Sequence, residues 1–157
     1  NTSRQTMEIA GFLMEKGIDF PKIIDDSFFA KTYGQAKLHG RAVLDSVRIL
    51  DNRCVYTVVT TDELREYGCT VKATDGIVDQ LRIIEGIEIA FLLYQTGNPD
   101  EYKVSLRTNS AVDVSRIALS FGGGGHVKAA GCTMTGEPQE IVEKISGKIR
   151  EQWEELK

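Results

Sequence analysis

A run of four glycines and a histidine, residues 122–126, constrains this chain more than any other feature of its sequence. Consecutive glycines carry a large conformational-entropy cost, which a folded domain seldom bears unless the backbone must adopt a positive φ or be approached closely. Apolar residues flank the run, with Ile117 and Phe121 before it and Ala129 and Ala130 after it. We therefore predict that the run belongs to a packed domain and is not a flexible linker.

The chemistry of this run favours an anionic ligand. Successive backbone N–H groups in a glycine-rich turn can point toward one anion, and a phosphate suits such a nest. We therefore interpret Gly122, Gly123, Gly124 and Gly125 as a phosphate-binding loop. His126 follows directly, and its imidazole can donate a hydrogen bond to a phosphate oxygen or to a base.

Length and charge narrow the class of protein. The chain has 157 residues, about one domain, and a net charge of −4. An acidic chain argues against binding long nucleic-acid tracts, where clustered Lys and Arg supply affinity, but it allows small nucleotide ligands. The longest apolar stretch, residues 89–94, is far shorter than the roughly 18 residues that a membrane span needs. No membrane partner is expected.

The cysteines indicate a reducing environment. Cys54, Cys69 and Cys132 form no C-x-x-C pair and have no histidine at a metal-ligand interval. We interpret all three as small buried hydrophobic residues, and we predict no metal site in this chain. No secretory signal is visible, so a cytoplasmic location is expected.

The apolar periodicity divides the chain into two parts. It predicts three helices in the first part, at residues 7–16, 21–30 and 34–50. We place the boundary between the parts at residue 52, which leaves 53–157 as the compact domain.

Strands and helices alternate in the second part. Strands are expected at 54–59, 87–94, 102–108 and 131–135. Helices are expected after the first of these strands, ending at residue 67, then at 75–84 and 114–121, and finally from residue 138 onward. Thr60 and Glu63 have the spacing of a capping box, and Asp113 can cap the helix that follows it. The turn at 97–100 should pair its flanking strands antiparallel. The predicted fold class is α/β, a mixed sheet flanked by helices and preceded by a helical linker segment.

Several segments together resemble a known family signature. They are Ser105-Leu106-Arg107, Val112-Asp113-Val114-Ser115, and Phe121 through His126 followed by Ala129-Ala130-Gly131. They look like the DHH-associated domain, the C-terminal substrate-binding domain of DHH-family phosphoesterases. Asn1-Thr2 with Ile9-Ala10 resembles the end of the catalytic domain in the nano-RNase branch, also described as oligoribonucleases and 3′-phosphoadenosine-5′-phosphate phosphatases. The resemblance spans nearly the whole chain and is loosest over residues 1–50.

One family motif is absent from this chain. The family holds catalytic Mn²⁺ with an Asp-His-His triplet and further aspartates of its N-terminal domain, whereas the only histidines here are His39 and His126. The resemblance therefore implies a substrate-binding module, with residues 1–52 as helical linker or end of the catalytic domain and 53–157 as the DHH-associated domain. The parent would be a Mn²⁺-dependent phosphoesterase that hydrolyses short oligonucleotides or 3′-phosphoadenosine 5′-phosphate. No catalytic residue and no cofactor are expected in this chain.

The implied partners are a short oligonucleotide or nucleotide phosphate, the chain's own N-terminal catalytic domain and, in a homodimer, a second copy. The resemblance assigns the glycine loop and His126 to substrate binding. Arg107 is a third candidate, because a guanidinium can grip a phosphate through two parallel hydrogen bonds. Ser105 lies on the same strand face and is a fourth. Lys128 is read as a solvated surface lysine.

Two alternatives stay open. The same class of enzyme could act on cyclic dinucleotides, longer single strands or pyrophosphate, or the chain could be a non-catalytic nucleotide- or RNA-binding module. An Asp-His-His triplet upstream in the complete reading frame would separate enzyme from module.

Outside the glycine loop, His39 is interpreted as a packed or surface imidazole. Asp25 and Asp26 point about 100° apart on a helix and cannot easily share one metal.

Overall fold

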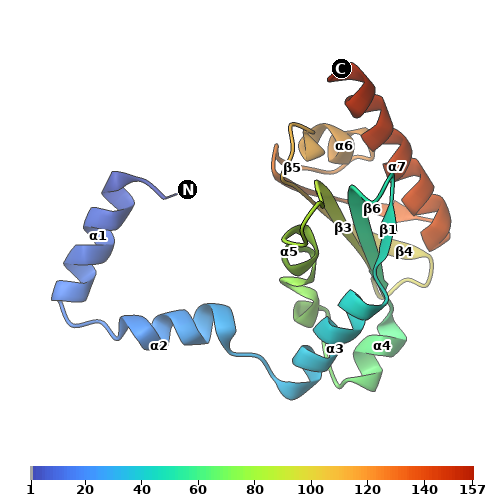
Figure 1. The fold of residues 1–157 in the computed structure, drawn as a ribbon. Helices are drawn as coiled ribbons and strands as arrows, with labels where there is room; N and C mark the ends of the chain where they lie inside the picture. Colours follow the sequence, from blue (N-terminus) through green and yellow to red (C-terminus); the bar gives the residue numbers. More distant parts are fainter. Residues whose placement is uncertain (1) are drawn as a thin grey trace. The chain divides into compact units, whose positions relative to one another are not determined.

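The computed structural model describes residues 2–157, and the chain forms two compact units (Figure 1). The first unit ends at Thr32 and the second is Tyr33–Lys157. The second unit takes in residues 33–52, which precede the boundary predicted from the sequence. None of the helices in the described part of the chain is both long and apolar enough to cross a membrane.

The first unit consists of two helices and a π-helical turn. These are α1 (Arg4–Glu15), α2 (Phe20–Ile24) and η1 (Asp25–Phe29). Ser3 caps α1 by accepting a hydrogen bond from the backbone N–H of Thr6, and Pro21 lies in the first turn of α2, where its missing N–H costs nothing. The helices predicted at 7–16 and 21–30 are thus found, although no residue of 2–32 is buried.

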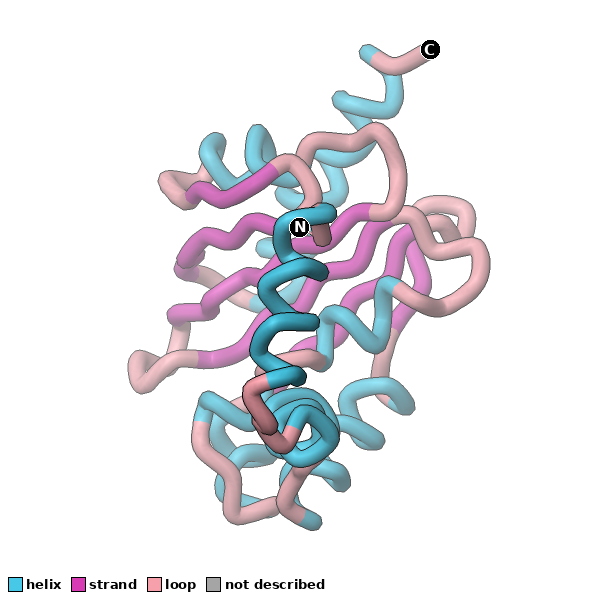
Figure 2. Tube along the Cα trace, turned by 90° about the vertical axis from the view of Figure 1, so that its left-hand side faces the viewer, coloured by secondary structure: helices cyan, strands magenta, loops and turns pink. Residues whose placement is uncertain are grey.

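The second unit is built on one six-stranded sheet, seen as the magenta strands in Figure 2. The strands are β1 (Val47–Ile49), β2 (Cys54–Val59), β3 (Ile89–Gln95), β4 (Glu101–Thr108), β5 (Gly124–His126) and β6 (Ala129–Thr135). Their order across the sheet is β1-β2-β3-β4-β6-β5. Within residues 2–157, β2 and β3 are the only strands that pair in parallel, so the sheet is mixed, as predicted.

Helices cover the two faces of the sheet unequally. On one face, α6 (Val114–Ser120) and α7 (Pro138–Glu155) pack on alternate residues of β2, β3, β4 and β6 in the larger core cluster. On the other face lie α3 (Tyr33–Leu44), α4 (Thr61–Glu66), the 3-10 turn η2 (Val71–Thr74) and α5 (Ile77–Arg82), and Figure 1 shows α5 and α7 on opposite sides of the strands.

The second core cluster explains where the sheet stays uncovered. Among the described residues it takes side chains from α3, α5, β2 and β3, such as Leu38, Leu81 and Leu92, and none from β4 or β6. The second face of β4 and β6 therefore lies outside the core clusters, and its side chains, Lys103 and Thr133 among them, are exposed or half-buried.

Two elements differ from the sequence predictions. The helix predicted at 34–50 ends at Leu44, and 47–49 form β1 instead, because an antiparallel partner in β2 satisfies their backbone groups. Residues 124–126, predicted as part of a loop, form the edge strand β5, paired with β6.

Candidate phosphate-binding site

The sheet register brings the predicted site residues onto one face. Arg107 in β4 pairs with Ala129 in β6, which in turn pairs with His126 in β5. Residues directly opposite one another point to the same face of an antiparallel pair, so Arg107 and His126 flank the small side chain of Ala129. Ser105 lies in the adjoining row, where it pairs with Gly131.

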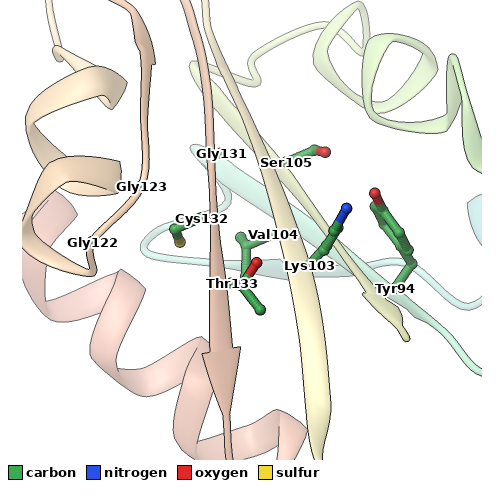
Figure 3. Close-up of a pocket in the computed structure, with 9 residues that line it drawn as sticks. All are labelled: Tyr94, Lys103, Val104, Ser105, Gly122, Gly123, Gly131, Cys132 and Thr133. Carbon is green, nitrogen blue, oxygen red and sulfur yellow. The ribbon is translucent and has the colours of Figure 1, made fainter. Parts of the chain in front are cut away.

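We call Arg107, Ala129 and His126 the Arg107–His126 row. A pocket of about 370 Å³ opens beside this row on the same face (Figure 3). Nine residues of four segments line it: Tyr94, Lys103, Val104, Ser105, Gly122, Gly123, Gly131, Cys132 and Thr133. The pocket thus includes three of the predicted residues, whereas Gly124, Gly125, His126 and Arg107 lie outside its lining. Sequence reasoning missed Tyr94, Lys103 and Thr133. The alternation of side chains along strand 101–108 could have identified Lys103 as a pocket residue, because it places Lys103 on the same face as Ser105 and Arg107.

The four glycines differ in what their backbone requires. A Cβ at Gly123 would lie 2.2 Å from the carbonyl oxygen of Gly131, and one at Gly125 would lie 2.5 Å from the Cα of Ala130. Gly122 adopts φ +75, which favours glycine. By contrast, no described atom lies within 4 Å of a Cβ built at Gly124. Close packing of this segment on β6 therefore accounts for part of the glycine run.

Two N–H groups of the run are already engaged. The N–H of Gly122 donates to the carbonyl of Leu119 at 3.1 Å, and that of Gly123 donates to the carbonyl of Ala118 at 2.9 Å. Both bonds complete the C-terminal turn of α6, whose last carbonyl groups would otherwise lack partners. These two N–H groups are therefore occupied within the fold and are not available to an anion.

Arg107 is held in place by a carboxylate that the sequence did not point to. Its Nε lies 3.4 Å from Oδ1 of Asp79 on α5, and its Nη1 donates to the carbonyl of Leu106 at 3.0 Å. Asp79 also accepts a hydrogen bond from Nε of Arg82 at 2.9 Å. The Arg107 side chain is 28% exposed, so part of its guanidinium can still reach a ligand.

The start of α6 anchors the hairpin that carries His126. Oδ1 of Asp113 accepts hydrogen bonds from the N–H groups of Ser115 (2.9 Å) and Arg116 (3.3 Å), which confirms the predicted cap. The Ser115 hydroxyl also donates to Asp113 and lowers the pKa of that carboxyl. The N–H of Val114 donates to the carbonyl of Val127 in the turn after β5. Lys128, predicted to be a solvated lysine, is exposed and also donates to the carbonyl of Ser110.

This architecture matches one protein family. The DHHA1 domain family matches residues 51–154, a span that contains five of the six strands and the whole pocket. The chain belongs to this family. Its DHHA1 domain thus includes every residue that the sequence analysis proposed for ligand binding.

Two curated relatives match this chain over part of their own length. The bifunctional oligoribonuclease and PAP phosphatase NrnA of Thermus thermophilus is 28% identical over 153 residues, which are 97% of this chain and 45% of the relative. The oligoribonuclease NrnB of Bacillus subtilis is 55% identical over 40 residues, 25% of this chain and 10% of the relative. The chain therefore spans less than half the length of the curated relatives it matches.

Solved structures share the fold of this DHHA1 domain. An exopolyphosphatase-related protein from Bacteroides fragilis superposes with a TM-score of 0.85 at 22% identity, covering 96% of this chain and 44% of that one. The pGpG-specific phosphodiesterase PggH from Vibrio cholerae superposes with a TM-score of 0.50 at 13% identity, covering 74% and 39% of the two chains.

Cys54, Cys132 and His39 serve packing in the second unit. Burial raises the pKa of the Cys54 thiol to about 12 and that of Cys132 to about 11, which suits buried hydrophobic roles. Cys69 is only half-buried, so the expectation of three buried cysteines holds for two. His39 is 3% exposed, with its Nε2 at 2.9 Å from the carbonyl oxygen of Ala73, which confirms a packed imidazole.

Proposed function

We propose that this DHHA1 domain binds the phosphate-bearing end of a short oligonucleotide or of 3′-phosphoadenosine 5′-phosphate. It would present that phosphate to the catalytic domain of a DHH-family phosphoesterase. The observation that carries the proposal is the row in which Arg107 and His126 flank Ala129 on an uncovered sheet face. Family membership and the names of the two curated relatives support the same reading.

The side chains of this row suit a phosphate. Two hydrogen-bonding positions of the Arg107 guanidinium are directed to Asp79 and to a backbone carbonyl, and its other N–H groups can donate to an anion. His126 of β5 adds a ring N–H and Ser105 of β4 adds a hydroxyl, from the strands on either side of β6. Ala129 and Gly131 carry little or no side chain between them, so a phosphate or a base can lie close to the backbone.

The residues of this chain do not fit a manganese site. Within residues 2–157, no three His, Cys, Asp or Glu side chains come together in a way that could hold a metal ion. Manganese would be a ligand of the N-terminal catalytic domain that the family resemblance implies. The role we assign to this chain is to bind and orient the substrate.

Isothermal titration of the chain tests this assignment. The ligands are AMP, 3′-phosphoadenosine 5′-phosphate and inorganic tripolyphosphate. Arg107→Lys should weaken nucleotide binding by about ten- to a hundredfold, or about 1.5–3 kcal/mol, because an ammonium cannot reproduce the planar fork. His126→Ala should weaken it by about 1–3 kcal/mol without a large change in melting temperature.

Arg150→Ala is the matched control, since Arg150 is an exposed cation on α7, beyond the opposite face of the sheet. Equal affinities for the wild type and both site variants would contradict the proposal. Binding of tripolyphosphate but of neither nucleotide would instead assign the site to a pyrophosphate-type substrate.

A further inference from the structure

The pocket extends away from the Arg107–His126 row to a second polar row on the same face. In this second row, Lys103 of β4 pairs with Tyr94 of β3 on one side and with Thr133 of β6 on the other. Lys103 and Arg107 are four positions apart on an extended strand, which places their Cα atoms about 13 Å apart, with Ser105 between them. The pocket lining includes the second row and Ser105.

The second row carries an available cation and an aromatic ring. Lys103 is exposed, and among the described residues none forms an ion pair with its ammonium. Glu101, two residues away on the same strand face, accepts hydrogen bonds from Thr96 Oγ1 (2.6 Å) and Asn98 Nδ2 (3.3 Å) instead. Figure 3 shows the Tyr94, Lys103 and Ser105 side chains projecting from neighbouring strands on the same side of the sheet.

We propose that Tyr94, Lys103 and Thr133 form a second nucleotide subsite. The subsite rests on the proposed function, in which the Arg107–His126 row holds the first phosphate. Lys103 would hold the phosphate that links the first nucleotide to the next, and the ring of Tyr94 would stack on the base of that next nucleotide. Stacking on an aromatic ring tolerates any base, and a lysine binds phosphate as a point charge, so the subsite senses length rather than sequence.

The consequence is a preference for a dinucleotide over a mononucleotide. The two rows are separated along the strand by the row of Ser105. A dinucleotide offers one phosphate to each row and a second base to Tyr94, whereas AMP offers a single phosphate and a single base. The chain should therefore bind 5′-phosphorylated diadenylate (pApA) more tightly than AMP. Removing the second row should abolish this difference while leaving AMP binding intact.

Titration of both ligands into matched variants tests the subsite. Lys103→Ala should weaken pApA binding by about tenfold, the size expected for one charge-assisted contact, and leave AMP binding within twofold. Tyr94→Leu, which keeps an apolar side chain against the core, should weaken pApA binding by at least fivefold. Lys144→Ala removes an exposed lysine from α7, on the other side of the sheet, and should change neither affinity.

The outcomes separate this proposal from the proposed function. Equal loss of AMP and pApA affinity in Lys103→Ala would mean a general electrostatic effect and would overturn the subsite. Unchanged pApA affinity in Lys103→Ala, with AMP binding still sensitive to Arg107→Lys, would overturn the subsite alone. Failure of the wild-type chain to bind either ligand would overturn both proposals.

Discussion

Gly123 offers the sharpest test of why the glycine run exists. A Cβ there would lie 2.2 Å from the carbonyl oxygen of Gly131, 2.5 Å from Cβ of Cys132 and 2.6 Å from its Cα. Two of these three atoms belong to the backbone of β6. Because β6 is hydrogen-bonded to β4 on one side and to β5 on the other, its backbone cannot shift without straining these pairings. We therefore expect the free energy of unfolding of Gly123→Ala to be about 1–3 kcal/mol lower than that of Gly124→Ala, the usual cost of overpacking.

Gly124→Ala is the internal control for this experiment. No described atom lies within 4 Å of its added Cβ, and its φ is not in the left-handed region. Replacing either glycine by alanine restricts the unfolded chain in the same way, by about 0.4–1 kcal/mol in favour of folding. The difference between the two variants therefore isolates the steric clash.

Urea unfolding and thermal melting of the two variants measure this difference. In a domain of this size, each kcal/mol corresponds to about 3–5 °C in Tm, so Gly123→Ala should melt roughly 3–15 °C below Gly124→Ala. If the two variants melt within about 1 °C of each other, the close packing of residues 122–125 on β6 is not what requires glycine.

Three further predictions concern the ion pair of Arg107, the cap of α6 and the burial of the cysteines. Asp79→Ala should weaken AMP binding severalfold, because it removes the carboxylate that orients Arg107. In the Arg107→Ala background the same change should cause no further loss of AMP affinity. Additive losses of affinity would show that Asp79 does not act through Arg107. Asp113→Ala should cost about 0.5–2 kcal/mol of stability at pH 7, measured by urea unfolding. The Ser115 hydroxyl lowers the pKa of the Asp113 carboxyl. The ionised carboxylate therefore contributes its full stabilisation above the ordinary carboxyl pKa, and this stabilisation is lost as the pH falls through the lowered pKa. The free energies of unfolding of wild type and variant should accordingly converge in acid. A thiol reagent at pH 8 should label Cys69 well before Cys54, whose pKa burial raises to about 12; equal labelling rates in the native protein would contradict this.

The sequence alone determined the features that depend on neighbours along the chain. The capping box at Thr60 and the cap at Asp113 were predicted correctly, because each uses hydrogen bonds that span two or three residues. Alternation placed Ser105 and Arg107 on one strand face, and the turn after β3 predicted the antiparallel pairing with β4. The family signature lies in the same segments, so the match to the DHHA1 domain could also be anticipated.

Only the tertiary structure decided the features that depend on partners far along the chain. Residues 47–49 and 124–126 became strands because β2 and β6 offered backbone partners to segments whose own sequence favours a helix end or a loop. The contact between Asp79 and Arg107 and the pocket row of Tyr94, Lys103 and Thr133 arise from packing and register. A hydrogen bond within one turn is encoded by the few residues that make it, whereas a pairing across the sheet depends on the arrangement of the whole domain.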